Sequence, residues 1–236
     1  TEISSQIPEL LNGVSSSSAE DEILISYLAR VNYNYDGKYL FSSSIRRDKS
    51  SRFFSDEQEG FFPSASIGWV ASKEGFLENH SIISNLKFTG SIGSTGNNRI
   101  RRNSFAQALG LTFNYILNDQ LQSGTGPTTA QNLDLTWEKS VKQNYGFELG
   151  LVDNKYTFSL DYYNNNNTDV LIDQPTIPSA GVPSGVISTN AAEIEVSGLD
   201  ITFGYNDWEG DFKWNLWANI TTSDATVLST GPNDQI

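Results

Sequence analysis

Strict alternation of apolar and polar residues runs through long segments of this sequence and limits what the chain can fold into. In the clearest segment the apolar positions are Tyr145, Phe147, Leu149 and Leu151, with polar residues or glycine between them. Because successive side chains of a β-strand point to opposite faces, such a segment predicts a strand with one apolar face. The pattern recurs at residues 27–35, 39–45, 155–162, 199–206 and 212–221. The chain is therefore predicted to be all-β.

The connections between these segments are of two kinds. Tight turns are predicted at Asp36-Gly37, Asp153-Asn154 and Glu209-Gly210. Long polar loops are predicted at 47–60, 95–136 and 164–193. Two further strands are expected at 61–71 and 86–94, joined by a segment, 72–85, with room for a helical turn. This gives about eight long strands, each near the ~9–11 residues that a tilted strand needs to cross a bilayer.

An antiparallel up-and-down path through these strands places the short turns at one end and the long loops at the other. That arrangement is typical of outer-membrane β-barrels. Aromatic residues make up 12% of the chain, and several lie beside the predicted turns, where a membrane–water interface would fall. The predicted interfacial aromatics are Tyr35, Tyr39, Trp69, Trp137, Tyr156, Trp208, Phe212 and Trp214.

Alternating strands also build water-soluble proteins, so two other folds stay open at this point. A soluble secreted β-sandwich, acting as a carbohydrate-binding module through exposed rings, would press Phe158, Leu160, Phe203 and Leu216 into a closed core. A large barrel would turn the same side chains toward lipid. A small barrel of eight strands that closes on itself is the third alternative. Strand lengths beyond the usual ~5–6 residues favour the large barrel.

Composition excludes several classes of protein. The formal net charge is −13, which repels nucleic acid phosphates, so no nucleic-acid partner is predicted. The chain has no Cys, so disulfides and thiolate metal sites are excluded. No apolar run approaches the ~18 residues of a transmembrane helix.

No catalytic, cofactor-binding or metal-binding residues are predicted, and the chain is not expected to be an enzyme. The single histidine, His80, has neither a Cys nor a second His with which to form a metal site or a triad. Acidic groups at 56–59 and 207–211 have oxygen ligands that suit Ca²⁺, but they miss the EF-hand spacing. Solvated loop charge is the favoured interpretation of both.

One charged cluster, Arg46, Arg47, Asp48 and Arg52, stands at a predicted strand end and in the loop beyond it. Two interpretations apply. The cluster would line the outer part of a barrel lumen and contact a substrate or an internal plug, or it would form an ion network at the rim that satisfies itself. We favour the second, because charges near a rim pair readily.

Several segments, in order, resemble the SusC/RagA family of TonB-linked outer-membrane proteins of Bacteroidetes. The matching segments are 44–53 (SIRRDKSSRF), 60–69 (GFFPSASIGW), 91–97 (SIGSTGN), 135–139 (LTWEK) with 144–151, 161–163 with 168–171, and 193–200. They keep the family order and cover roughly residues 24–225. The sequence departs from the family pattern at Lys49, at Val196-Ser197 and in lacking a Pro before Leu135, which puts local loop geometry in doubt.

The resemblance implies part of a barrel of about 22 antiparallel strands around an N-terminal plug. Residues 1–23 would then be a polar loop or barrel connection, 24–225 a partial barrel, and 226–236 the start of the next outer loop, with the plug domain absent. The N-terminus lacks an initiator Met and a signal pattern, so the chain is expected to be cut from a longer protein. That protein is expected to sit in the bacterial outer membrane and import glycans or peptides. Its implied partners are a SusD-like surface lipoprotein, TonB and outer-membrane lipid.

Overall fold

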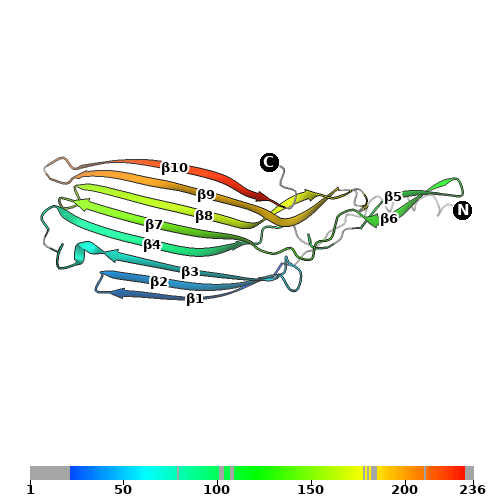
Figure 1. Cartoon of the computed structure of the whole chain (residues 1–236), viewed down its shortest axis with the longest axis horizontal. Coiled ribbons are helices and arrows are strands. Elements are labelled where there is room, and N and C mark those ends of the chain that lie inside the picture. The colour runs from blue at the N-terminus through cyan, green and yellow to red at the C-terminus, as the bar shows by residue number, and fades with distance from the viewer. Residues whose placement is uncertain are drawn as a thin grey trace, which may run out of the picture.

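The computed structural model describes residues 22–78, 80–100, 104–106, 109–177, 179, 181, 185–209 and 211–231. Eight long strands form one antiparallel sheet in the order β1-β2-β3-β4-β7-β8-β9-β10 (Figure 1). Their bounds are β1 Leu24–Tyr35, β2 Tyr39–Ser50, β3 Glu59–Val70, β4 Ile83–Asn97, β7 Glu138–Leu151, β8 Tyr156–Pro175, β9 Val186–Asp207 and β10 Trp214–Thr230. The predicted all-β, up-and-down class and the expected eight strands are confirmed.

The sheet is a single open layer in the part of the chain that the structure describes. β1 and β10 are its two edges and do not pair with each other, so the self-closing barrel of eight strands is wrong. Phe158 pairs with Phe203, and Leu160 with Ile201, on one face that no second sheet covers. A closed core between two layers, which the sandwich requires, is therefore not observed.

The strand registers sort the side chains into two faces. One row of register partners crosses all eight strands and is apolar throughout: Tyr35, Tyr39, Trp69, Phe88, Phe147, Leu160, Ile201 and Ile220. A parallel row on the opposite face is polar or small: Asn32, Ser42, Ser66, Ser91, Asn144, Tyr163, Gly198 and Ser223, with Tyr163 its one ring. We call these the apolar face and the polar face.

The β1–β2 and β7–β8 turns at one end are short, as predicted, while the β3–β4 connection at that end is longer. Asp36 (φ 53°) and Gly37 (φ 63°) form the β1–β2 turn, closed by the Lys38 amide, which donates to the Tyr35 carbonyl at 2.9 Å. The left-handed backbone there explains the glycine. The predicted helical turn is the 3₁₀ segment η1 (Ala71–Lys73). Gly210 of the third predicted turn lies outside the described residues. We call this end of the sheet the short-turn end and the opposite one the loop end.

Two predicted loops hold more strand than expected. The 164–193 prediction is wrong for most of its length, because β8 runs on to Pro175 and β9 starts at Val186. The two strands pair here through polar side chains and without apolar alternation. Asn166 on β8, for example, donates to the Glu193 carboxylate on β9 at 2.8 Å. The 95–136 segment contains a hairpin, β5 (Leu109–Leu117) and β6 (Gln120–Pro127), which projects beyond the loop end (Figure 1).

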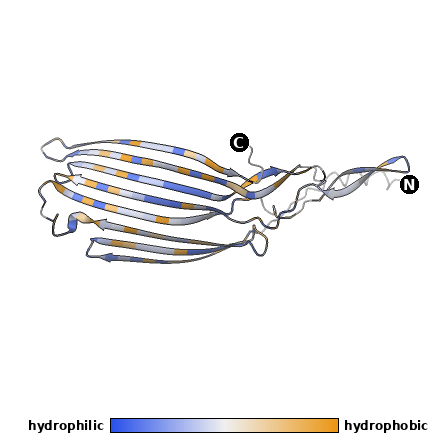
Figure 2. Cartoon of the chain, viewed as in Figure 1, coloured by the Kyte–Doolittle hydropathy of each residue, from blue (hydrophilic) through white to orange (hydrophobic). Residues whose placement is uncertain are grey.

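Apolar alternation covers only part of the length of the longest strands. Hydrophobic colour alternates along the strands nearer the short-turn end, while the loop-end part of β7 and β8 is mostly hydrophilic (Figure 2). β10 reaches Thr230, beyond the expected boundary at residue 225, and residues 1–21 and 232–236 lie outside the described residues. No helix among the described residues has the length and hydrophobicity to cross a membrane.

Candidate functional site

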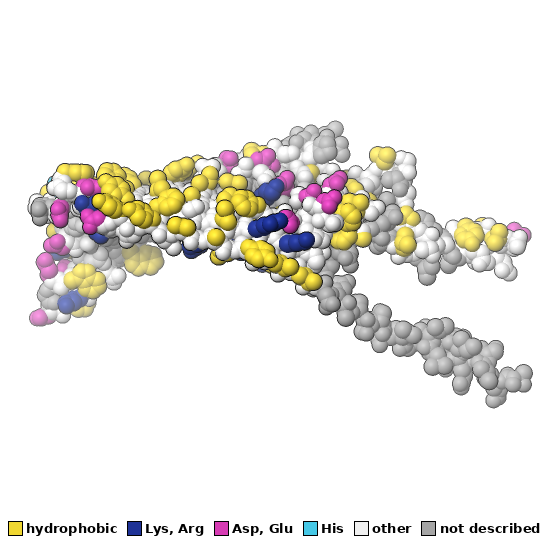
Figure 3. Space-filling view, turned by 90° about the horizontal axis from the view of Figure 1, so that it is seen from below, with side chains coloured by type: hydrophobic (Ala, Val, Ile, Leu, Met, Phe, Trp, Pro, Cys, Tyr) yellow, Lys and Arg dark blue, Asp and Glu magenta, His cyan; other side chains and the backbone are white. Residues whose placement is uncertain are grey.

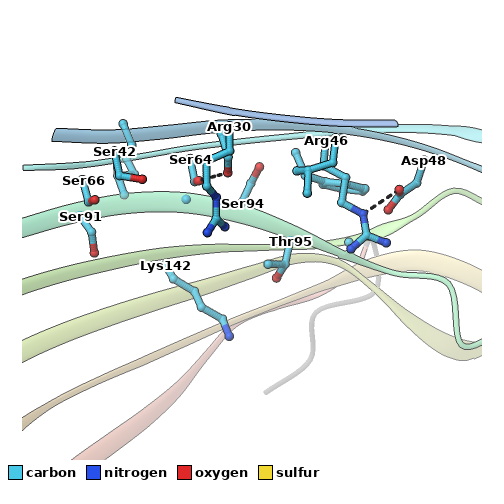
Figure 4. Close-up of a pocket in the computed structure, with 17 residues that line it drawn as sticks. Arg30, Ser42, Arg46, Asp48, Ser64, Ser66, Ser91, Ser94, Thr95 and Lys142 are labelled. Atoms are coloured by element: carbon cyan, nitrogen blue, oxygen red, sulfur yellow. Dashed lines mark hydrogen bonds and ion pairs between the residues drawn. The ribbon is translucent and has the colours of Figure 1, made fainter. Parts of the chain in front are cut away.

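The polar face is hollowed over β1–β4 and β7. The hollow has a volume of about 550 Å³. Its lining consists largely of small hydroxyl side chains and long basic ones (Figure 4): Arg30, Ser42, Ser44, Arg46, Ser64, Ser66, Ser91, Ser94, Thr95 and Lys142. The period of two along each strand gathers these residues, since every strand contributes alternate positions to the same face. We call this hollow the hydroxyl groove.

The floor of the hydroxyl groove is held by hydrogen bonds between neighbouring strands. The Ser44 and Ser64 hydroxyls lie 2.7 Å apart on β2 and β3. Nearer the edge, the Ser42 hydroxyl contacts the Asn32 side-chain oxygen at 2.7 Å. These contacts hold the hydroxyl groups in place, and each hydroxyl oxygen can still accept a hydrogen bond from a bound group.

The structure separates the predicted charged cluster into three parts. Arg46 reaches the hydroxyl groove and donates to the Asp48 carboxylate at 2.7 Å, and Asp48 is only 4% exposed. Arg47 lies on the opposite face and pairs with Glu59. Arg52 lies in the β2–β3 loop, where its guanidinium makes two bonds to Glu22 at 2.6 and 2.8 Å. Only Arg46 and Asp48 therefore line the groove.

A compact apolar cluster closes the loop end of the groove. It consists of Phe53, Phe62, Ile100 and Trp137, and we call it the loop-end cluster. The Trp137 ring lies 5.3 Å from Phe53 and 5.5 Å from Phe62, between ring centroids. Its indole N–H donates to the Gln58 carbonyl at 3.1 Å. Rings packed this way bury large areas and favour tilted or edge contacts.

The prediction that Trp137 is an interfacial aromatic is wrong. Its side chain is 3% exposed and faces Phe62 across the loop end, so it has no surface to offer lipid headgroups. The alternation pattern could not show this, because the burial depends on Phe53, which the β2–β3 loop folds over the strands.

The other predicted interfacial aromatics lie toward the short-turn end. On the apolar face the Tyr35 ring lies tilted beside the Tyr39 ring, with centroids 6.3 Å apart, and Trp69 stacks on Phe88 at 5.7 Å. A second group lies in or beside the β7–β8 and β9–β10 turns: Tyr156, Tyr205, Trp208, Phe212 and Trp214, of which Trp208 and Phe212 are strongly exposed. Seen from the β1 side, hydrophobic side chains spread along much of the sheet (Figure 3).

Glu74, just after η1, joins the aromatic residues to the turn. The Tyr39 hydroxyl donates to its carboxylate at 2.6 Å and the Trp69 indole N–H at 3.2 Å. These two hydrogen bonds stabilise the charged form and hold the pKa of Glu74 below its ordinary value. The carboxylate thus fixes the two rings at this edge of the apolar face.

Sequence reasoning missed Arg30 and Lys142 as residues of the groove. The alternation does place Arg30 with Asn32 and Asn34 on a polar face, which was the available signal. It could not show that Lys142, far away in the chain, lies in the same transverse row, because that depends on which strands pair and in what register.

The described residues offer little for catalysis or metal binding. Among them, no group of three His, Cys, Asp or Glu side chains is arranged to hold a metal ion. His80 has a local role, since its Nδ1 accepts hydrogen bonds from the amides of Ile82 and Ile83 at 3.3 and 3.1 Å. It orders the turn that leads into β4.

Eight long antiparallel strands, two faces of opposite polarity and two open edges define the class: a section of the wall of a large β-barrel. The family model described as "TonB dependent receptor-like, beta-barrel" matches residues 7–235, and the chain belongs to that family. The resemblance found in the sequence is confirmed.

Named relatives and solved structures agree. The chain is 31% identical over 222 residues to the TonB-dependent receptor P3 of Formosa agariphila, covering 94% of this chain and 22% of that protein. It is 31% identical to the TonB-dependent receptor SusC of Bacteroides thetaiotaomicron, covering 89% and 21%. The structure of the RagAB peptide transporter matches with a TM-score of 0.75 at 25% identity, covering 88% of this chain and 22% of that one. The chain thus spans about a fifth of the length of these relatives.

Proposed function

We propose that this chain forms part of the channel wall of a TonB-dependent transporter in the bacterial outer membrane. The observation that carries the proposal is the pair of rows that cross all eight strands, one apolar and one polar. A sheet of this kind suits a barrel whose outside contacts hydrocarbon and whose inside is wet. The matched relatives are described as receptors and transporters, which supports transport rather than catalysis.

The whole protein would import oligomeric nutrients, either glycans or peptides. The likeness to the RagAB peptide transporter supports peptides, and the resemblance to the SusC/RagA family implies glycans as the alternative. The protein would work with a SusD-like surface lipoprotein at the loop end and with TonB at the short-turn end, through an N-terminal plug. On this orientation Tyr35, Tyr39, Trp69, Tyr156, Trp208, Phe212 and Trp214 mark the periplasmic membrane interface.

The charged residues of the rim take different roles under this proposal. Arg46 and Asp48 would face the lumen, where they would contact the plug or a passing substrate. Arg47 and its partner Glu59 would lie on the outside of the barrel, near the outer lipid headgroups. Arg52 would stabilise the loop end through Glu22.

Two adjacent residues on β3 provide a direct test of the two faces. Ile67 is on the apolar face and Ser66 on the polar face. In a cysteine-free, full-length receptor, Ile67→Cys and Ser66→Cys would each be labelled with a fluorophore and reconstituted in vesicles containing doxyl-labelled lipid. We expect strong quenching at position 67 and little at position 66. Equal quenching at both positions would contradict the barrel-wall proposal.

Transport itself is tested in cells. Deleting the full-length gene should abolish growth on one complex glycan or peptide mixture, and deleting the cell's TonB should have the same effect. Growth that needs the receptor but not TonB would contradict energy-coupled import.

A further inference from the structure

The hydroxyl groove contains a transverse row with a cation at each end. The register partners run Arg30, Ser44, Ser64, Gly93 and Lys142, across β1, β2, β3, β4 and β7. Four inter-strand steps of about 4.8 Å place the two backbone ends of the row about 19 Å apart along the sheet. Both basic side chains are exposed and lie on the same side of the sheet as the serines (Figure 4).

The floor between the two cations is low and lined by hydroxyl groups. Gly93 leaves the row open at β4, and a Cβ there would meet the Ser64 Cβ at 2.9 Å. The neighbouring row on the polar face adds Ser42, Ser66 and Ser91. An extended solute can therefore lie against the strands and contact hydroxyl groups along its length.

The hydroxyl groove carries an excess of positive charge, whereas the chain as a whole is negative. Its lining holds three cations, Arg30, Arg46 and Lys142, and a single carboxylate, Asp48, although the net charge of the chain is −13. Asp48 is engaged by Arg46. As far as the structure describes the chain, Arg30 and Lys142 enter no ion pair, so their charge is available to a bound group.

The rest of the polar face has the opposite character. Nearer the short-turn end Lys87 is neutralised by Glu148 at 2.7 Å, while Asp161 and Asp200 are direct register partners on β8 and β9. Excess positive charge is thus a local property of the hydroxyl groove and not of the whole inner surface.

We propose that the hydroxyl groove binds solutes carrying oxyanion groups, carboxylates or sulfate esters, with Arg30 and Lys142 contacting separate anionic groups and the serines contacting the backbone or hydroxyls of the solute between them. This rests on the proposed transport function and specifies its substrate class as acidic oligomers. Guanidinium and ammonium groups make charge-assisted hydrogen bonds to such oxygens, and the guanidinium can bind them in a bidentate manner. Both contacts weaken as salt screens them.

The probe is a dextran sulfate oligosaccharide, with uncharged dextran of the same length as its reference. Binding to the purified full-length receptor is measured by calorimetry in 50 and 200 mM NaCl. We expect the wild type to bind the sulfated probe at least tenfold more tightly than dextran at low salt. The variants are Arg30→Gln and Lys142→Gln, singly and together. The double variant should lose the preference, and Arg30→Lys with Lys142→Arg should keep most of it.

The matched control is Lys213→Gln, which removes one positive charge from the β9–β10 turn and should leave binding unchanged. No preference in the wild type, or equal losses in the control and the groove variants, would overturn the inference. A further outcome separates the other source of oxyanions. If the double variant binds the sulfated probe normally but exposes the plug to trypsin, the groove holds plug carboxylates and the substrate assignment is wrong.

These outcomes are distinct from failure of the transport proposal. A receptor that shows the expected lipid quenching at position 67 but no anion preference overturns only the substrate class. A receptor without that quenching overturns the barrel wall itself.

Discussion

The loop end and the short-turn end of this sheet are stabilised in different ways. At the loop end, Phe53, Phe62 and Trp137 bury one another and need no other molecule to cover them. At the short-turn end, Tyr35 and Trp69 also contact other rings but stay 58% and 38% exposed. The loop end thus resembles the core of a water-soluble protein, whereas the rings at the short-turn end stay exposed on the surface of the sheet.

Under the proposed location in the outer membrane, the difference follows from the solvent at each end. Loops in water must bury apolar side chains against each other, because the hydrophobic effect acts there. Rings at a membrane interface gain stability from the lipid and headgroups instead. We therefore expect the two ends of the sheet to open independently of each other. A mutation at one end should then change amide hydrogen exchange at that end only. The reporters are the amide of Ser50, bonded to the Gln58 carbonyl, and the amide of Val70, bonded to the Lys38 carbonyl.

The largest effect is expected from Trp137→Ala in the full-length receptor in lipid. Removing a buried ring leaves a cavity, so the free energy of opening at the Ser50 amide should fall by about 3–5 kcal/mol. The Val70 amide should not change. Trp69→Ala is the matched control and should affect Val70 but not Ser50. A response of both amides to either substitution would show that the two ends open together.

Arg52→Gln should come next. The substitution removes the paired bonds to Glu22 and those to the carbonyls of Asn98 and Ile100 at 3.2 and 3.1 Å. Hydrogen bonds to charged groups contribute about 1.5–3 kcal/mol, so protection of the Ser50 amide should drop by that amount. Arg47→Gln, whose ion pair is solvent-exposed, should leave this protection nearly unchanged. Equal losses would mean that Arg52 contributes only surface charge.

Gly96→Ala tests the packing of the loop-end cluster. A Cβ at this position would overlap the Phe62 ring, which also packs against the Trp137 ring. Overpacking of this kind should cost about 1–3 kcal/mol at the Ser50 amide, again measured by exchange. Phe62→Leu in the same chain should recover part of the loss. Gly75→Ala, where a Cβ meets nothing within 4 Å, should be neutral.

The smallest effect is a pH dependence confined to the short-turn end. Glu74 has a lower pKa in the folded protein than in the unfolded chain, so it contributes stability above its unfolded pKa. That contribution is lost as the pH falls through the folded pKa, when the proton competes with the Tyr39 and Trp69 hydrogen bonds. Exchange at Val70, corrected for its intrinsic rate, should therefore rise in acid, and Glu74→Gln should remove this dependence. A parallel rise at Ser50 would contradict a local origin.

Much of the fold could be predicted because alternation is a local property. Tyr145 to Leu151 specify a strand and its apolar face by themselves, and Asp36-Gly37 specify the turn that follows the first strand. The boundaries were predicted less well. The strand that continues from Asn164 to Pro175 lacks apolar alternation, and its pairing with β9 provides the stability that the local sequence does not show.

The sequence by itself determined the two faces, the order of the strands and the family, because these depend on period two, turn residues and motifs that follow one another along the chain. Tertiary structure decided which residues meet. Only strand register brings Arg30 and Lys142 to opposite ends of one row, and only the folded β2–β3 loop buries Trp137. Register and loop packing depend on contacts between residues far apart in the chain, so no local pattern could specify them.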